Sequence, residues 1–413
     1  MWPATPCRAL SRAFLARLCF WSLAALSAVS VALVLLLSYG DRVEERLLLM
    51  QLPWQTPGCR PDRSTGGVSP QARARFLSSP GELCRPGAEP FLLICVASAP
   101  EHRSRREAIR ETWGGVRKVA VASGGGGGGR ALDVRVVFVL GVTRSDRTRA
   151  SVQNESVERR DIVQAEFLDT YRNLTLKTMA TLQWFVSRCP RVRFLLKADD
   201  DVFVNPHSLV EHLHGAHGPA SPADDDYGGG GKGGGGVGGG GGEGGHDLYL
   251  GRVHSRVRPN RDPASKAFVS DERFPGDHYA PYCSGTAYVL SGSAARKVLS
   301  TALLLPAPLL PLEDVFVGEC ARRAGLRPSH TALFSGSLRL PFNRCCYGRI
   351  FSSHRMEPAD QRRAWSVLRG PPCSHVERLA GFAVCRALGM IAGAWASLVG
   401  RQSNITASAS GFA

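Results

Sequence analysis

The chain has 413 residues, of which 44% are hydrophobic, so a sizeable core can form. Its formal net charge of +16 is carried mainly by arginine, which suits nucleic acid, an acidic glycan, an anionic leaving group or an anionic membrane. No zinc-finger or RNA-binding signature interleaves basic with aromatic residues, so we expect no nucleic-acid partner.

An uncharged apolar run lies near the start of the chain, at residues 18–39, behind an arginine-containing segment at residues 1–17. The run is long enough to cross a bilayer as a helix. The charges that flank it predict, by the positive-inside rule, a cytosolic tail, an uncleaved signal anchor and a body on the far side of the membrane. A cleaved signal peptide is the alternative, but the run is long for one and no clean A-x-A site follows it.

Two further features agree with a lumenal body. Sequons begin at Asn154, Asn173 and Asn404. Ten cysteines lie beyond the predicted anchor, and an even count in an oxidising compartment predicts several disulfides, whose pairing the sequence leaves open. Cys95 lies in a strand pattern and can equally be a free buried thiol.

Residues 40–88 are polar and lack sustained periodicity, which predicts a stem. Residues 89–373 predict an ordered domain, because apolar runs typical of buried strands alternate with segments of helical spacing. The predicted strands include residues 91–98, 134–141 and 192–198, and the predicted helices include residues 101–115 and 174–189. This alternation predicts an α/β layered fold with a largely parallel sheet.

Two glycine-rich segments interrupt the predicted domain, at residues 124–129 and 228–245. They lack the Lys-Ser/Thr pair of a phosphate loop and open no periodic helix, so we expect disordered loop insertions. A C-terminal extension follows at residues 374–413. Within it, residues 387–400 are apolar but glycine-containing and short for a span, which favours a packed or membrane-surface helix.

The segment FLLKADDDVFVN, residues 194–205, places Asp199, Asp200 and Asp201 directly after an apolar strand. Ligands of α/β sheets bind beyond the carboxyl ends of strands. Because three adjacent carboxylates repel one another, a bound Mg²⁺ or Mn²⁺ is a natural compensation. The alternative is a helix N-cap, but capping needs one such side chain rather than three.

Five segments in order resemble the inverting β-1,3-glycosyltransferases, the family of β-1,3-galactosyl- and β-1,3-N-acetylglucosaminyltransferases. Residues 105–114 resemble its Arg-rich helix, residues 166–178 its sequon-bearing segment and residues 194–205 its D-x-D segment. Residues 279–291 resemble its glycine-bearing acceptor-side loop, and residues 312–320 its catalytic-base motif. The resemblance implies a GT-A-like nucleotide-sugar-binding fold, with a mostly parallel mixed sheet flanked by helices. It also implies a single-pass type II Golgi membrane enzyme that uses a UDP-sugar donor.

The same resemblance assigns the metal ligands. Asp201, the last carboxylate of the D-x-D, is expected to bind Mn²⁺ or Mg²⁺. A divalent ion stabilises the charge that builds on a departing diphosphate. His354 resembles the histidine that ends a late strand of the family, so we expect it to be a second ligand. A structural role is the alternative for this histidine.

The donor side is expected to include five further residues. By the resemblance, Asp199 faces the ribose of the nucleotide, and Asp200 lies beside it. Lys197, Arg106 and Arg110 can supply positive charge near the diphosphate. Arg106 and Arg110 are four residues apart and share one helix face, for which a solvated surface is the equal alternative.

The catalytic base is expected at Asp314. An attacking hydroxyl must lose its proton as its bond to the sugar forms. A carboxylate across the site from the leaving group fits an in-line displacement that inverts the anomeric carbon. Its neighbour Glu313 is the rival for this role, and for both residues N-capping of the following helix is the non-catalytic alternative.

The acceptor is suggested only by the resemblance. Segments 248–254, 310–318 and 344–350 are most similar to the branch whose acceptor is the terminal GalNAc of a ganglioside, and 283–288 to galactosyltransferases, which implies UDP-galactose. One departure is Ala287, where relatives often have glycine, and its side chain is expected to narrow the pocket. The alternatives are a β-1,3-galactosyltransferase for GlcNAc-terminated glycans of glycolipids or glycoproteins, a β-1,3-N-acetylglucosaminyltransferase using UDP-GlcNAc, and an inactive sugar-binding relative.

Overall fold

The computed structural model describes residues 20–24, 27, 74–81, 83–85, 87–122, 129–217, 247–305 and 310–409, with side chains to residue 392. The chain divides into two compact units, residues 1–50 and 51–413. In the first unit, the few described residues are helical. Among all described residues, no helix is both long and apolar enough to span a bilayer. Most of the predicted anchor, and both glycine-rich insertions except Gly129, lie outside the described residues.

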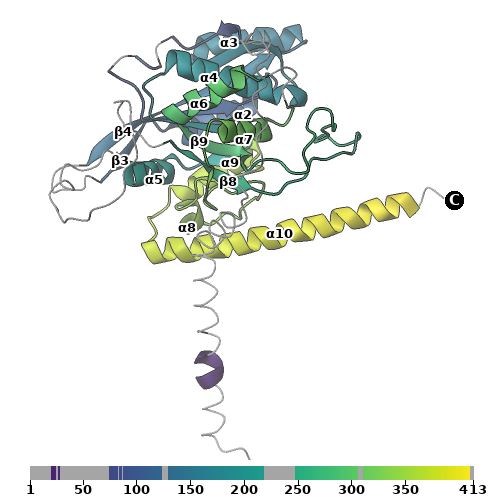
Figure 1. The fold of residues 1–413 in the computed structure, drawn as a ribbon. Coiled ribbons are helices and arrows are strands. Elements are labelled where there is room, and N and C mark those ends of the chain that lie inside the picture. The colour runs from purple at the N-terminus through teal and green to yellow at the C-terminus, as the bar shows by residue number, and fades with distance from the viewer. Residues whose placement is uncertain are drawn as a thin grey trace, which may run out of the picture. The chain divides into compact units, whose positions relative to one another are not determined.

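The second unit is built on a mixed sheet, which has nine strands among the described residues (Figure 1). The strands are β1 (Phe76–Ser78), β2 (Leu92–Ala97), β3 (Lys118–Val121), β4 (Arg130–Val142), β5 (Ile162–Leu168), β6 (Phe194–Asp199), β8 (Tyr249–His254), β9 (Tyr282–Ser291) and β10 (Ser329–His330). Their order is β1-β5-β4-β2-β6-β9-β8-β10, and β3 pairs with β4. The α/β prediction is confirmed.

Parallel pairing is concentrated at the centre of this sheet. Strands β5, β4, β2 and β6 run parallel to one another. Strand β9 is antiparallel to both β6 and β8. The segment expected as a glycine-bearing loop is thus largely a central strand, and the carbonyl oxygen of Gly285 within it accepts a hydrogen bond from Lys197 of β6. Strand β1, in the predicted stem, pairs with β5 at the edge.

Helices cover both faces of the sheet (Figure 1). One core joins β-strand residues to α4, α6 and α7, and the other joins them to α2, α5, α8, α9 and the start of α10. The helices are α2 (Arg103–Glu111), α3 (Asp146–Arg159), α4 (Leu174–Arg188), α5 (Pro206–His217), α6 (Gly292–Leu303), α7 (Glu313–Arg323), α8 (Arg344–Tyr347), α9 (Pro358–Leu368) and α10 (His375–Ala409).

The central strands are apolar on both faces because both faces are covered. In β2, Leu92, Ile94 and Val96 enter one core, whereas Leu93 and Cys95 enter the other. Successive side chains of a strand point to opposite faces, so a continuous apolar run is needed here. Cys95 is a free buried thiol, as one of the two sequence interpretations had it.

A second, two-stranded sheet completes the edge where β6 ends. Strand β7 (Phe203–Val204) pairs antiparallel with β11 (Ser352–Ser353). Because Phe203 lies opposite Ser353, the chain just before β7 runs beside the chain just after β11, and Asp201 meets His354 there. Two segments far apart in the sequence thereby meet at the acidic triplet.

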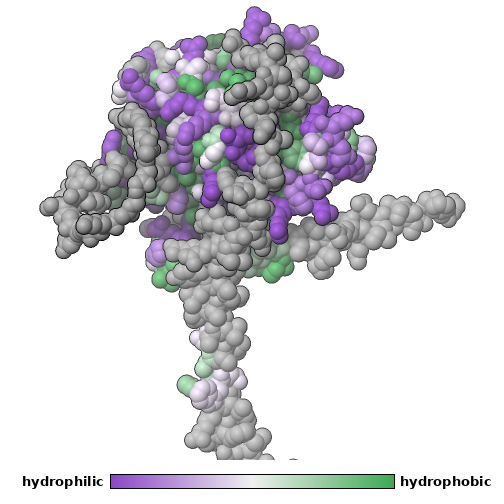
Figure 2. Space-filling model, viewed as in Figure 1, coloured by the Kyte–Doolittle hydropathy of each residue, from purple (hydrophilic) through white to green (hydrophobic). Residues whose placement is uncertain are grey.

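Two disulfides join distant parts of the second unit. Cys84 is bonded to Cys189 at the end of α4, and Cys345 in α8 is bonded to Cys373 before α10. The described part of α10 also exposes hydrophobic side chains, which appear as green patches along this helix in Figure 2; they include Val376, Val384, Leu388 and Ile391. Phe382 and Cys385 of α10 are buried in the core, so the C-terminal extension begins as a packed helix.

Candidate functional site

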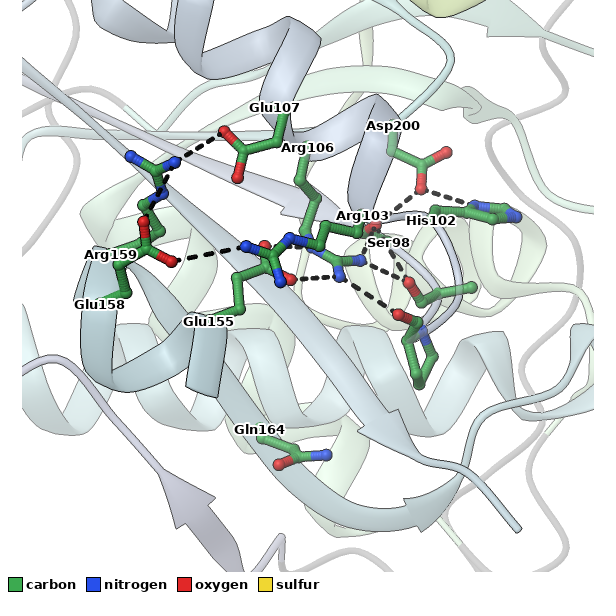
Figure 3. Close-up of polar contacts among 12 residues, drawn as sticks. Ser98, His102, Arg103, Arg106, Glu107, Glu155, Glu158, Arg159, Gln164 and Asp200 are labelled. Atoms are coloured by element: carbon green, nitrogen blue, oxygen red, sulfur yellow. Dashed lines mark hydrogen bonds and ion pairs between the residues drawn. The ribbon is translucent and has the colours of Figure 1, made fainter. Parts of the chain in front are cut away.

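Asp200, the middle carboxylate of the triplet, is held entirely by protein groups. It is buried and accepts hydrogen bonds from Ser98 Oγ at 2.7 Å and Arg105 at 3.1 Å. His102 Nδ1 lies 2.8 Å from the same carboxylate (Figure 3). Burial opposes its charge, but the hydrogen bonds from His102, Ser98 and Arg105 outweigh burial and lower the pKa of Asp200. In return, Asp200 raises the pKa of His102.

Asp199 is paired with a different cation, Lys197 of the same strand. Lys197 Nζ lies 2.6 Å from the Asp199 carboxylate. The same ammonium group donates to the carbonyl oxygen of Gly285 on β9 and lies 3.6 Å from Glu313 on α7. Burial lowers the pKa of Lys197, but the carboxylates of Asp199 and Glu313 outweigh it and the pKa is raised. Burial also raises the pKa of Asp199 against the attraction of Lys197.

Asp201, the third carboxylate of the triplet, is paired with a histidine. His354 Nε2 lies 3.5 Å from Asp201 Oδ2, and the backbone N–H of Met356 donates to the Asp201 carbonyl at 2.8 Å. Burial would raise the pKa of Asp201, but the contact with His354 outweighs it and lowers that pKa. Among the described residues, His354 is the one ion-pair partner of Asp201. The two predicted metal ligands are therefore adjacent.

Asp314 lies in the first turn of α7, beside β9. Its Oδ2 accepts a hydrogen bond from the backbone N–H of Gly285 at 3.1 Å, and its side chain is half-buried. A Cβ on Gly285 would lie 3.2 to 3.3 Å from the side chains of Glu313 and Asp314, so glycine permits this close approach. Leu312 holds the N-cap position, so neither acidic residue is the cap.

Glu313 is buried and bonds to a different partner from Asp314. It accepts a hydrogen bond from the Tyr288 hydroxyl at 2.9 Å. Burial raises its pKa to about 7; Lys197 opposes this shift, and the charge of Asp314 adds to it. Glu313 is therefore a member of the Lys197 network, whereas Asp314 is half-buried and bonds to the backbone of Gly285.

Aromatic side chains adjoin Asp314 from β8 and β9. His254 and Tyr282 stack at 5.4 Å between ring centroids. Tyr279 and Tyr282 share a small apolar cluster with Val315 at the start of α7. Burial raises the pKa of both tyrosines and lowers that of His254, and in all three the negative charge of Asp314 raises the pKa. Tyr279 and Tyr282 are both buried, so this cluster packs the start of α7 beside Asp314.

Arg106 and Arg110, expected on the donor side, are both engaged by acidic side chains. Arg106 is fully buried and makes a bidentate pair with Glu155 on α3, at 2.8 and 2.7 Å (Figure 3). Arg110 pairs with Glu155 and Asp161. Both guanidinium groups are thus engaged with buried or half-buried acids. A donor contact from Arg106 would require it to leave its pair with Glu155.

Ala287 is also placed differently from the expectation. It lies opposite Ala198 in the β6–β9 pairing and is fully buried in the core. Its methyl group packs among apolar side chains, so it does not narrow a pocket at the site. The alternation of strand β9 explains this, because Thr286 and Ala287 must point to opposite faces.

Three site residues were missed by the sequence reasoning: Ser98, His102 and Arg105. Ser98 follows β2, which is the parallel neighbour of β6, with Ala97 opposite Asp199. The carboxyl ends of adjacent parallel strands meet at one edge. That rule, applied to the strand at residues 91–98, would have placed Ser98 and the residues after it beside the triplet.

Comparison with known proteins bears on the same region. A family profile described as galactosyltransferase matches residues 104–226 and 242–332. The matched residues include the acidic triplet at the end of β6, strand β9 and helix α7. The similarity therefore covers the elements that bring Lys197, Gly285 and Asp314 together.

Individual proteins are similar over most of the chain. The beta-1,3-galactosyltransferase 4 of Mus musculus is 41% identical over 328 residues, which cover 77% of this chain and 85% of the mouse protein. Its namesake in Homo sapiens is 40% identical over 343 residues, covering 77% and 86%. The human acetylgalactosaminyl-O-glycosyl-glycoprotein beta-1,3-N-acetylglucosaminyltransferase is 36% identical over 304 residues, covering 70% and 69%.

The buried ion pair beneath the site generates a stability prediction. Arg106→Gln leaves Glu155 buried with Arg110 alone, so we expect the free energy of unfolding to fall by about 3 to 5 kcal/mol. The matched control is Arg103→Gln, which removes the exposed pair with Glu158 and should cost at most about 1 kcal/mol. Urea unfolding followed by circular dichroism measures both, and equal losses would contradict the structural role of Arg106.

Proposed function

The chain belongs to the galactosyltransferase family, and from this premise we propose that it moves galactose from UDP-galactose to the 3-hydroxyl of an acceptor sugar, forming a β-1,3 linkage. The observation that carries the proposal is the placement of Asp314. Its carboxylate borders the acidic triplet through Gly285 and Lys197. The similarity to proteins called beta-1,3-galactosyltransferase 4 supports the choice of galactose and of the linkage.

The proposed chemistry is a single in-line displacement. The acceptor oxygen forms a bond to the anomeric carbon, the bond from that carbon to the diphosphate breaks, and UDP departs. The pKa of a sugar hydroxyl lies far above that of a carboxylic acid, so the proton must leave as the new bond forms. Asp314 takes this proton, and attack from the side opposite UDP inverts the anomeric carbon.

Asp201 and His354 are proposed to hold a divalent ion, Mn²⁺ or Mg²⁺. Their oxygen and nitrogen atoms converge from β7 and β11, and both atom types are acceptable ligands for Mn²⁺. In the described part of the chain, no three metal-ligating side chains form one cluster, so oxygens of the donor diphosphate or water would complete the shell. When bound, the ion would neutralise charge on the departing diphosphate.

The remaining acidic and basic residues are proposed to position the donor. Asp199 is the partly exposed carboxylate at the end of β6 and is proposed to face the ribose. The ion pair with Lys197 orients Asp199, and the hydrogen bonds of Asp200 hold the segment after β2 in place. We assign Arg106 and Arg110 to the support of that segment rather than to the diphosphate, because acids already engage both.

The cellular placement is inferred from the sequence and the disulfides. We infer a single-pass type II protein of the Golgi membrane, with residues 18–39 as anchor and the catalytic unit in the lumen. The uncharged apolar run supports the anchor. The bonds Cys84–Cys189 and Cys345–Cys373 support an oxidising compartment.

The acceptor is proposed to be the terminal GalNAc of a ganglioside, as the resemblance of three segments implies. A β-1,3-N-acetylglucosaminyltransferase is the second candidate, because a transferase of that name is also similar to the chain.

A donor screen tests the proposal. We expect the full-length protein with Mn²⁺ to transfer galactose from UDP-galactose to GalNAc-terminated gangliosides at a rate at least about tenfold above transfer from UDP-GlcNAc. The acceptor panel includes β-linked GlcNAc and galactose. Preference for UDP-GlcNAc would establish the second candidate, and no transfer or donor hydrolysis with any pair would favour an inactive sugar-binding relative.

Asp314→Asn tests the base. Loss of the proton acceptor is expected to lower kcat by about 10² to 10⁴-fold, with UDP binding unchanged by calorimetry. The matched variant Glu313→Gln keeps a hydrogen-bonding group opposite Tyr288 and should lose much less. Were Glu313→Gln the inactive variant and Asp314→Asn the active one, the base would be Glu313.

Asp201→Ala tests the metal ligand. Removal of its carboxylate is expected to abolish Mn²⁺-stimulated transfer and to weaken Mn²⁺ binding measured by electron paramagnetic resonance. Transfer by the unmodified protein should fall on addition of EDTA and return with Mn²⁺. Mn²⁺ stimulation that persists undiminished in Asp201→Ala would contradict this assignment.

A further inference from the structure

Two free thiols lie together where α8 meets α10. Among the described residues, the cysteines outside the two disulfides are Cys95, Cys283, Cys320, Cys346 and Cys385, all of them buried. The first three belong to the core that contains α4, α6 and α7. Cys346 and Cys385 lie together in the other core, on two helices, α8 and α10, that pack against each other.

The close approach of α10 to α8 explains this contact. A Cβ on Gly381 would lie 2.9 Å from Cβ of Cys345 and 3.1 Å from the backbone nitrogen of Cys346, so the two helices touch at this glycine. Cys385 follows Gly381 by four residues and therefore lies on the same face of α10. Its Sγ also donates to the carbonyl oxygen of Pro341 at 3.4 Å. The side chain thus points toward the segment that leads into α8.

A disulfide already exists at the next position. Cys345, the neighbour of Cys346, is bonded to Cys373, so this region of the chain is oxidised. We propose that Cys346 and Cys385 form a further disulfide, which fixes α10 to α8. Nothing in the transfer reaction requires these thiols, so the inference stands apart from the proposed activity, although it shares the oxidising compartment with it.

The oxidation balances with a disulfide donor of the secretory pathway, such as oxidised glutathione or a protein disulfide. Each cysteine thiol loses one proton and one electron, the S–S bond forms, and the donor disulfide is reduced to two thiols. Burial and the hydrogen bond to Cys385 raise the pKa of Cys346. Exchange needs the thiolate, so the bond must form before α10 packs, and once buried it is shielded from reductants.

Peptide mapping of the full-length protein, made in cultured mammalian cells, tests the pairing. The protein is denatured with N-ethylmaleimide and without reductant, and then cut with trypsin. We expect residues 345–349, 370–378 and 379–386 in one species joined by two disulfides, because cleavage follows Arg344, Arg349, Arg369, Arg378 and Arg386. Fragmentation between Cys345 and Cys346 assigns each bond. The control thiol, Cys95, should carry the maleimide.

Three results would overturn the inference. The first is maleimide on both Cys346 and Cys385. The second is a bond from either of them to any other cysteine, including the exchanged pairs Cys345–Cys385 and Cys346–Cys373. The third comes from Cys385→Ala, which should leave Cys346 open to the maleimide; an unmodified Cys346 in that variant would show a different partner. None of these readouts requires activity, so failure of the transfer assay and failure of this pairing are separable.

Discussion

A buried ammonium group holds the candidate site together. Lys197 is nearly inaccessible to solvent, yet it contacts three separate elements: Asp199 on its own strand, the Gly285 carbonyl on β9 and Glu313 on α7. An isolated charge at this depth would be costly, and the surrounding carboxylates compensate it. The site therefore depends on a charge balance that spans the end of β6 and the start of α7.

The same balance divides the acidic triplet into three roles. Asp200 accepts hydrogen bonds from Ser98 and Arg105 and contacts His102, whereas Asp199 forms an ion pair with Lys197. Each of these two carboxylates has a full positive charge beside it. Among the described residues, the ion-pair partner of Asp201 is an imidazole, which carries charge only when protonated. Asp201 is thus the one member of the triplet that is paired with neither a lysine nor an arginine there, which fits the metal ion proposed at this position.

The sequence predicted the elements better than it predicted the contacts. Strands β2, β4 and β6 and helices α2, α4 and α7 follow from apolar runs and helical spacing, and the family resemblance drawn from five segments is confirmed. The arginines at 106 and 110 show the limit. Two arginines four residues apart give the same sequence pattern whether they face water or a buried acid. Their acidic partner, Glu155, lies 49 residues from Arg106 along the chain. Only the fold brings these residues together.

The position of His354 makes the C-terminal part of the chain relevant to the site. Helix α8 supports strand β11, because the Tyr347 hydroxyl bonds to Ser353 at 3.3 Å. Asn205, at the end of β7, bonds to the Tyr347 carbonyl at 2.8 Å. Helix α10 packs against that same short helix, α8, at Gly381. The C-terminal extension lies beyond the residues that the family profile matches, yet through α8 it supports the strand pair that sets Asp201 against His354.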